Sequence, residues 1–122
     1  MKGKSNLAPE RYAEFAQYLV DVVRYLREEE GIPVQWISPI NEPQWNWSAK
    51  NGQEGCHFGP SEVLELTRVL LNTLEENQLD VQLSLFESGE WKSSDVYIDK
   101  LASDPKVWAA LPHLAIHSYW ST

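Results

Sequence analysis

The sequence has one cysteine, few basic residues and no long apolar run, and each shortage excludes a class of protein. Cys56 is the only cysteine among 122 residues, so no internal disulfide can form. Lysine and arginine number 10 against 18 acidic residues, which gives a net charge of −8. Nucleic acids and anionic membrane surfaces select for basic patches, so we expect neither as a partner. No stretch approaches the ~18 consecutive apolar residues of a membrane span.

Several chemical motifs are also missing. No glycine-rich phosphate loop follows any predicted strand, and no Gly-x-Ser-x-Gly elbow occurs. Cys56 and His57 are adjacent, but no second cysteine or histidine stands at metal-ligand spacing, so we expect no metal and no cofactor. The stretch Met1–Ser5 lacks the apolar core of a signal peptide, so an extracellular or periplasmic location would need a signal in the full-length protein.

Helical and strand patterns alternate along the chain. Apolar residues at helical spacing follow Pro9 and stop before Gly31 and Pro33, and a second such series runs from Pro60 to Asn77. A third helix is expected from a cap at Ser93 or Ser94 to Leu101, and a short one after Asp104. The predicted strands are Val34–Ile40, Val81–Phe86 and Leu114–His117.

This alternation predicts an α/β fold with parallel strands and helices packed outside. In such folds the reactive groups gather at the C-terminal ends of the strands. Polar or aromatic residues stand at that end of all three predicted strands: Asn41-Glu42, Glu87-Ser88 and His117-Ser118-Tyr119. We therefore expect these residues to form one site.

The residues after the first strand have the composition of a carbohydrate site. The Glu42 carboxyl can protonate a leaving oxygen, the Asn41 amide can bind a hydroxyl, and the indoles of Trp45 and Trp47 can stack on a sugar ring. Four of the six tryptophans follow predicted strands and are candidate sugar platforms, whereas Trp36 and Trp108 fall inside regular elements and are expected to pack. The four candidates are Trp45, Trp47, Trp91 and Trp120.

The string Ser38-Pro-Ile-Asn-Glu-Pro-Gln-Trp-Asn-Trp47 resembles glycoside hydrolase family 30 of clan A, especially its endo-β-1,6-galactanase-like members. The resemblance implies that Glu42 is the general acid/base and that Asn41 binds the hydroxyl beside the anomeric carbon. It also implies that Tyr119 donates a hydrogen bond to the nucleophile and His117 one to the sugar or the carboxylates. Residues 1–122 would then be a fragment of a catalytic TIM (β/α)8 barrel, covering strands four to six.

A retaining mechanism needs a second carboxylate roughly 5 Å from the first. The resemblance places this nucleophile after the seventh strand, beyond Thr122, so the chain alone is expected to be inactive. Within the chain Glu87 is the alternative nucleophile, or else a residue that binds sugar or holds Glu42. The expected partners are an oligosaccharide or polysaccharide substrate, and remaining barrel segments or self-association to cover exposed strand edges.

Two other functions are consistent with the residues. The chain could be a non-catalytic carbohydrate-binding α/β module that keeps the aromatic platforms. It could also be a small α/β domain of its own, in which Asn41-Glu42-Pro43 is coincidental. That last alternative would not bring Glu42, Glu87, His117 and Tyr119 together.

Overall fold

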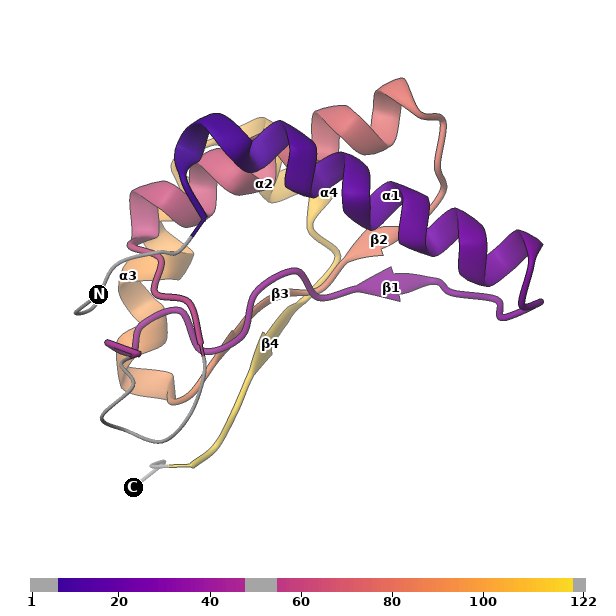
Figure 1. Cartoon of the computed structure of the whole chain (residues 1–122). Helices are drawn as coiled ribbons and strands as arrows, with labels where there is room; N and C mark the ends of the chain where they lie inside the picture. Colours follow the sequence, from indigo (N-terminus) through magenta and orange to yellow (C-terminus); the bar gives the residue numbers. More distant parts are fainter. Residues whose placement is uncertain (1–6, 48–54, 120–122) are drawn as a thin grey trace.

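The structure is a computed structural model that describes residues 7–47 and 55–119. Helices and strands alternate through most of it, as Figure 1 shows. In chain order the elements are η1 (Pro9–Arg11), α1 (Tyr12–Glu28), β1 (Trp36–Ile37), α2 (Pro60–Glu76), β2 (Gln82–Leu83), β3 (Leu85–Ser88), α3 (Trp91–Ala102), α4 (Pro105–Ala110) and β4 (Leu114–Ile116).

Local sequence signals set the ends of the helices. Pro60 is the first residue of α2, and the Glu62 carboxylate accepts a hydrogen bond from the Gly59 backbone N–H at 2.7 Å. Asp104 caps α4 by accepting hydrogen bonds from the N–H groups of Lys106 and Val107. The chain leaves α1 through Gly31, whose φ of 66° lies in the left-handed region.

The strands form parallel pairs around one central segment, residues 82–88. Its first half, β2, pairs with β1, and its second half, β3, pairs with β4. Trp36 lies opposite Gln82 in the first pair, and Leu85 lies opposite Leu114 in the second. The three segments predicted as strands are therefore neighbours running in one direction, and their C-terminal ends meet at one end of the molecule.

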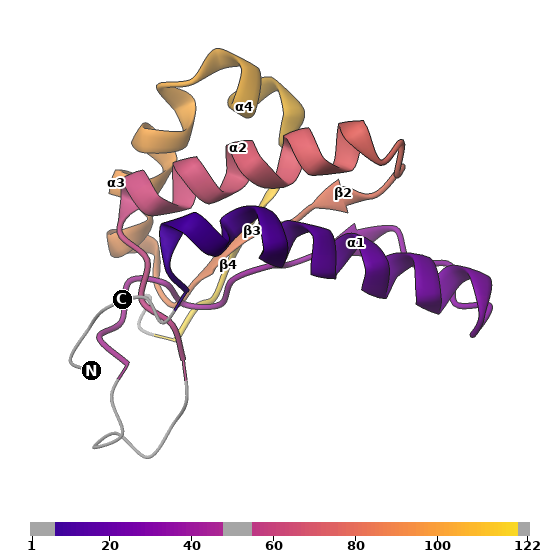
Figure 2. The ribbon, with the colours of Figure 1, turned by 45° about the horizontal axis from the view of Figure 1, so that its top comes forward.

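The helices pack together over the strands. Figures 1 and 2 show α1 and α2 side by side, with α3 and α4 beyond α2. Each helix turns its apolar side toward this core, and for α1 those residues are Tyr12, Ala16, Val20 and Val23. The strands contribute Leu83, Leu85 and Phe86, all at most 1% exposed. No helix in the described residues is long and apolar enough to cross a membrane.

Some details differ from the predictions. The strand expected over Val34–Ile40 is paired only at Trp36–Ile37, because Pro39 has no N–H to donate and the next residues turn toward the site. The helix expected from a cap at Ser93 or Ser94 begins earlier, at Trp91, and the residue at its N-cap position is Glu90. Both serine hydroxyls instead donate to the Glu90 carbonyl from inside α3.

The prediction that Trp36 and Trp108 are packing residues was wrong, since they are 40% and 43% exposed. The Trp36 ring is covered on one side by His113, with ring centroids 4.3 Å apart. Trp91, predicted to lie in a loop after a strand, is the first residue of α3 and is 60% exposed.

Candidate active site

Glu42 lies five residues after β1 in a backbone conformation that is unusual for a residue with a side chain. Its φ is 46°, in the left-handed region that favours glycine. Hydrogen bonds on both sides hold it there: its N–H donates to the Glu87 carbonyl at 2.9 Å, and its carbonyl accepts from the Trp45 N–H at 3.3 Å and from Trp47 Nε1 at 3.1 Å. The residue is 8% exposed, so its carboxyl group is largely withdrawn from water.

A β-bulge sets the direction of the Glu87 side chain. Along β3 and β4, Phe86 pairs with Ala115 and Ser88 pairs with Ile116, which leaves Glu87 as an extra residue on β3. Its φ is 53°, also in the left-handed region. The carboxylate then points toward the segment after β1, where Ser38 Oγ donates a hydrogen bond to Glu87 Oε1 at 2.8 Å.

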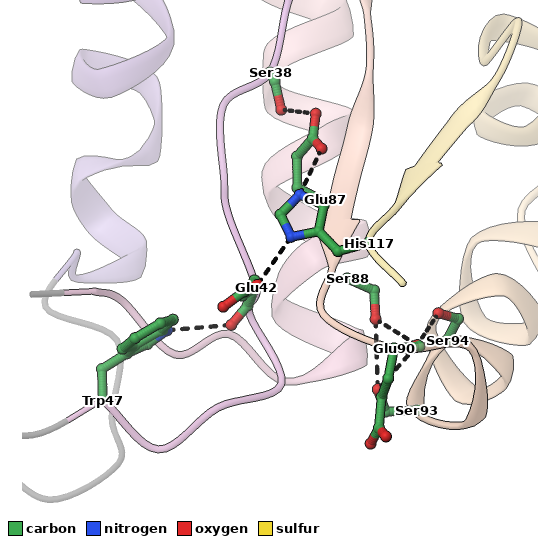
Figure 3. Close-up of polar contacts among 9 residues, drawn as sticks. All are labelled: Ser38, Glu42, Trp47, Glu87, Ser88, Glu90, Ser93, Ser94 and His117. Carbon is green, nitrogen blue, oxygen red and sulfur yellow. Dashed lines mark hydrogen bonds and ion pairs between the residues drawn. The ribbon is translucent and has the colours of Figure 1, made fainter. Parts of the chain in front are cut away.

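His117 joins the two glutamates. It follows β4, and its N–H donates to the Ser88 carbonyl at 2.6 Å. Its Nδ1 lies 2.8 Å from Glu42 Oε1 and its Nε2 lies 3.1 Å from Glu87 Oε2. In Figure 3 the imidazole stands between the two carboxylates, with one ring nitrogen toward each. The row Ser38, Glu87, His117 and Glu42 thus links all three strand ends.

The electrostatics of the row favour a charged imidazole. Hydrogen bonding to Glu42, and less strongly to Glu87, raises the pKa of His117 above its ordinary value, while partial burial opposes the rise. An imidazolium can donate from both ring nitrogens, which matches an acceptor on each side. The side chains of His117 and Glu87 are 27% and 24% exposed, so the row remains open to a ligand.

The other predicted site residues lie around this row. The Tyr119 ring stands edge-on to the His117 ring, with centroids 5.4 Å apart, and is 67% exposed. Asn41 is exposed beside Glu42, and Trp45 and Trp47 are half-buried in the loop that follows. Trp120 lies outside the described residues. The geometry therefore brings Glu42, Glu87, His117 and Tyr119 together, unlike a domain in which Asn41-Glu42-Pro43 is coincidental.

The loop that carries Trp45 is tied to the body of the molecule. His57 Nδ1 lies 3.2 Å from the Trp45 carbonyl, and the Phe58 N–H donates to the Pro43 carbonyl at 3.1 Å. The buried Tyr97 of α3 donates its hydroxyl to the Phe58 carbonyl at 2.7 Å. Burial, together with the nearby Glu62 charge, raises the pKa of Tyr97 to about 12, so this hydroxyl stays protonated.

Sequence reasoning missed three contributors to the site: Ser38, Gln44 and Gly89. Ser38 is the first residue of the string that resembles the family, but a serine before a proline does not by itself indicate a role in the site. A Cβ at Gly89 would lie 2.5 Å from the Gln44 amide and 2.8 Å from Trp45 Nε1, so only glycine fits without displacing them. A glycine directly after a polar strand end was the one available signal. In the described parts of the chain, no group of three or more His, Cys, Asp or Glu side chains, the row included, is arranged so that it could hold a metal ion.

Comparison with known proteins shows where this arrangement belongs. A family described as O-glycosyl hydrolase family 30 matches residues 1–104. An endo-β-1,6-galactanase of Hypocrea rufa is 32% identical over 75 residues, which are 61% of this chain and 16% of that protein. The chain thus spans about a sixth of that curated relative.

Solved structures agree on the fold. A conserved exported protein from Bacteroides fragilis matches with a TM-score of 0.78 and 26% identity, over 97% of this chain and 27% of that one. The catalytic domain of GH30 xylanase C from Talaromyces cellulolyticus matches with a TM-score of 0.75 and 19% identity, over 88% of this chain and 24% of that one. The resemblance found at Ser38–Trp47 is confirmed by the family match: this chain belongs to O-glycosyl hydrolase family 30.

Proposed function

We propose that this chain is part of a retaining β-glycoside hydrolase in which Glu42 is the general acid/base. The observation that carries the proposal is the hydrogen bond between a largely buried Glu42 and His117, which follow β1 and β4, the strands on either side of the segment 82–88. Active sites in parallel α/β folds lie at that end of the strands. The similarity to the endo-β-1,6-galactanase of Hypocrea rufa supports an endo-acting enzyme and makes a β-1,6-linked galactan the first substrate to test.

In a double displacement Glu42 acts first as a general acid and then as a general base. In the first step it gives a proton to the glycosidic oxygen while a carboxylate nucleophile attacks the anomeric carbon, and in the second it takes a proton from the attacking water. A group that both holds and accepts a proton benefits from a nearby base. The raised pKa of His117 favours the shared proton on the imidazole at rest. His117 Nδ1, 2.8 Å from Glu42 Oε1, can pass this proton to Glu42 before the first step and take back the proton that Glu42 removes from water in the second.

Glu87 fits a supporting role better than that of nucleophile. A nucleophile has to face the acid/base across the sugar, with the anomeric carbon between the two carboxyl groups. Here the His117 ring fills the space between Glu42 and Glu87, with a hydrogen bond to each. We therefore assign Glu87 to holding His117, and place the nucleophile on a strand outside this chain.

The remaining roles are proposals supported by nearness to the row. We assign Asn41, exposed beside Glu42, to binding the hydroxyl next to the anomeric carbon. We assign Trp45 and Trp47 to stacking on the sugar, and Tyr119, whose ring contacts His117, to donating a hydrogen bond to the nucleophile carboxylate. Trp120 remains a proposed substrate contact next to Tyr119.

Residues 1–122 are best explained as strands four to six of a (β/α)8 barrel, each with its preceding helix. Such barrels typically need ~250 residues. The alignment of nearly the whole chain with 27% of the Bacteroides protein supports this proportion. Remaining barrel segments, or a second copy, would cover the free edges of β1 and β4. That relative is described as exported, and export of the whole protein would suit a polymeric substrate outside the cell.

The test compares two substrates in a longer protein that contains this chain and a nucleophile strand. Glu42→Gln should lower kcat on a β-1,6-galacto-oligosaccharide by about 10²- to 10⁴-fold, because the poor leaving group needs a proton. Formation of the glycosyl intermediate from an aryl β-galactoside with an acidic phenol should be much less affected. A carbohydrate-binding module would show no hydrolysis before the substitution and unchanged affinity after it. Equal loss on both substrates would overturn the assignment of Glu42.

A further inference from the structure

Gln44 connects the loop after β1 to the turn after β3. Its amide oxygen accepts hydrogen bonds from Trp45 Nε1 at 3.0 Å and from the Gly89 N–H at 2.8 Å. The orientation of the amide follows from these neighbours, because both are donors and the NH₂ group could satisfy neither. Gln44 is half-buried, so these bonds are partly shielded from water.

The backbone at Gly89 passes close beneath the acid. A Cβ built there would lie 2.5 Å from the end of the Gln44 amide and 3.4 Å from the carboxyl carbon of Glu42. The absence of a side chain is what lets Gln44 reach the Gly89 N–H. One amide thus contacts the indole of Trp45, three residues after Glu42, and the Gly89 backbone close to the Glu42 carboxyl group.

Glu42 needs such support because its own conformation is costly. A non-glycine residue in the left-handed region persists only where its surroundings hold it. The hydrogen bonds at its N–H and carbonyl fix the Glu42 backbone, but their partners are the Glu87 carbonyl, the Trp45 backbone N–H and the Trp47 indole, and none lies in the turn after β3. Gln44 supplies the missing connection to Gly89, next to the segment from which Glu87 projects.

We infer that Gln44 is a positioning residue: its amide locks the Trp45 indole and the Gly89 turn together and thereby holds Glu42 against His117. The inference rests on the proposed role of Glu42 as the acid, but it concerns geometry that exists without substrate. The hydrogen bonds of the Gln44 amide go to Trp45 and Gly89, so we expect its effect on the acid to pass through these two residues.

The experiment uses the longer protein that contains this chain, without substrate, and two NMR signals: the indole Nε1–H of Trp45 and the imidazole nitrogens of His117. Gln44→Met keeps the side-chain length and removes the acceptor. We expect about five- to tenfold faster solvent exchange of the Trp45 indole proton, as for the loss of one net hydrogen bond. We also expect a lower pKa for His117, since a looser Glu42 binds the imidazolium less well.

Gln44→Glu separates position from charge. A carboxylate accepts from the same two donors, so the Trp45 proton should stay as protected as in the wild type. The added negative charge should raise the pKa of His117 further, because a nearby carboxylate stabilises the imidazolium. It would add to the effect of Glu42 and Glu87, the two acidic groups that already face His117. Gln35→Met is the matched control: Gln35 is exposed at the start of β1, and both signals should be unchanged.

Unchanged exchange and titration in Gln44→Met would overturn the inference. If that variant does not fold, Gln44→Glu decides, and faster indole exchange in it would overturn the inference as well. Both signals are read without substrate, so the effect of Gln44→Met on them can be present in a protein that fails every glycosidase test. It can also be absent from an active enzyme. The inference about Gln44 and the proposed function therefore fail independently.

Discussion

The Nδ1 atom of His117 lies 2.8 Å from Oε1 of Glu42, although 75 positions separate the two residues in the sequence. The other ring nitrogen contacts Glu87 at 3.1 Å. One imidazole therefore contacts acids from the ends of two other chain segments. Its titration reports on the geometry of the whole site, and two predictions depend on it.

The first prediction concerns the order of two substitutions. Glu42→Gln and Glu87→Gln should each lower the pKa of His117, because each removes a negative charge and an acceptor for the imidazolium. The effect of Glu42→Gln should be the larger, since its hydrogen bond is the main cause of the raised pKa. The measurement is a ¹⁵N NMR titration of the imidazole, with the signals of His57 and His113 as internal references. A larger effect from Glu87→Gln would contradict the geometry.

The second prediction concerns stability against pH. The pKa of His117 is raised in the folded chain from an ordinary value of 6.5, so the folded state binds the proton more tightly than the unfolded state. The resulting stabilisation is complete below pH 6.5 and disappears as the pH rises through the folded-state pKa.

The test of this second prediction is urea unfolding of the wild type and His117→Phe between pH 6 and pH 9. The difference in their free energies of unfolding should be largest at the acidic end and should shrink as the pH rises. The carboxylates stay ionised across this range in the unfolded chain, so they do not obscure the trend. A difference that grows with pH would show that His117 is bound as the neutral form.

The location of the site could be predicted from the sequence because it follows from topology. Alternating helices and strands imply parallel strands, and parallel strands bring their C-terminal ends together. Polar residues at three strand ends therefore had to be neighbours whatever the details of pairing. The helix ends could also be predicted from the sequence, because Pro60, Gly31 and Asp104 act through their own backbone or side chain within one turn.

The bulge and the hydrogen-bond row could not be predicted. Glu87 becomes the extra residue of a β-bulge only through its register against β4, which is set by packing between segments about 30 residues apart. The exposure of Trp36 has a similar origin: successive residues of a strand point to opposite faces, and a sequence pattern does not show which face is covered. Ser38 and Gln44 both lie in the string Ser38–Trp47, but their roles could not be predicted. Ser38 bonds one specific carboxylate, and Gln44 bonds an indole and a distant backbone N–H, and only the folded chain brings these partners close.

The third prediction compares two left-handed positions far from the site. Gln78 follows α2 with a φ of 52°, and its N–H and that of Leu79 donate back to Glu75 and Leu74, which is a Schellman ending usually built on glycine. Gln78→Gly should stabilise the chain by about 0.5 to 1 kcal/mol. Glycine removes the steric cost of a positive φ, and this gain exceeds the loss from the greater conformational entropy of glycine in the unfolded chain.

Gly31→Ala is the converse change. Gly31 has a φ of 66°, and a Cβ there would meet nothing within 4 Å, so only the backbone cost is tested. It should destabilise the chain by about 1 kcal/mol. Both values come from urea unfolding at one pH. A loss of stability in Gln78→Gly would mean that its side chain makes a contact worth more than the backbone strain.

The fourth prediction concerns the attachment of the aromatic loop to α3. Tyr97 is 4% exposed, stacks on Phe86 with ring centroids 5.1 Å apart, and donates to the Phe58 carbonyl. Tyr97→Phe should keep the stacking and lose the hydrogen bond, which costs about 1 kcal/mol of stability. In an ultraviolet titration, the variant should also lack the tyrosine whose pKa is about 12.

The consequence of Tyr97→Phe for the site is local. Without the tyrosine hydroxyl, the Phe58 backbone should move more freely, so its N–H, which donates to the Pro43 carbonyl next to Glu42, should exchange with solvent faster. Tyr18→Phe provides the matched control, because Tyr18 is 62% exposed on α1 and should change neither stability nor exchange. If Tyr97→Phe leaves Phe58 exchange unaltered, the loop is held at the site by Glu42 and its neighbours alone, and α3 has no part in placing the indoles.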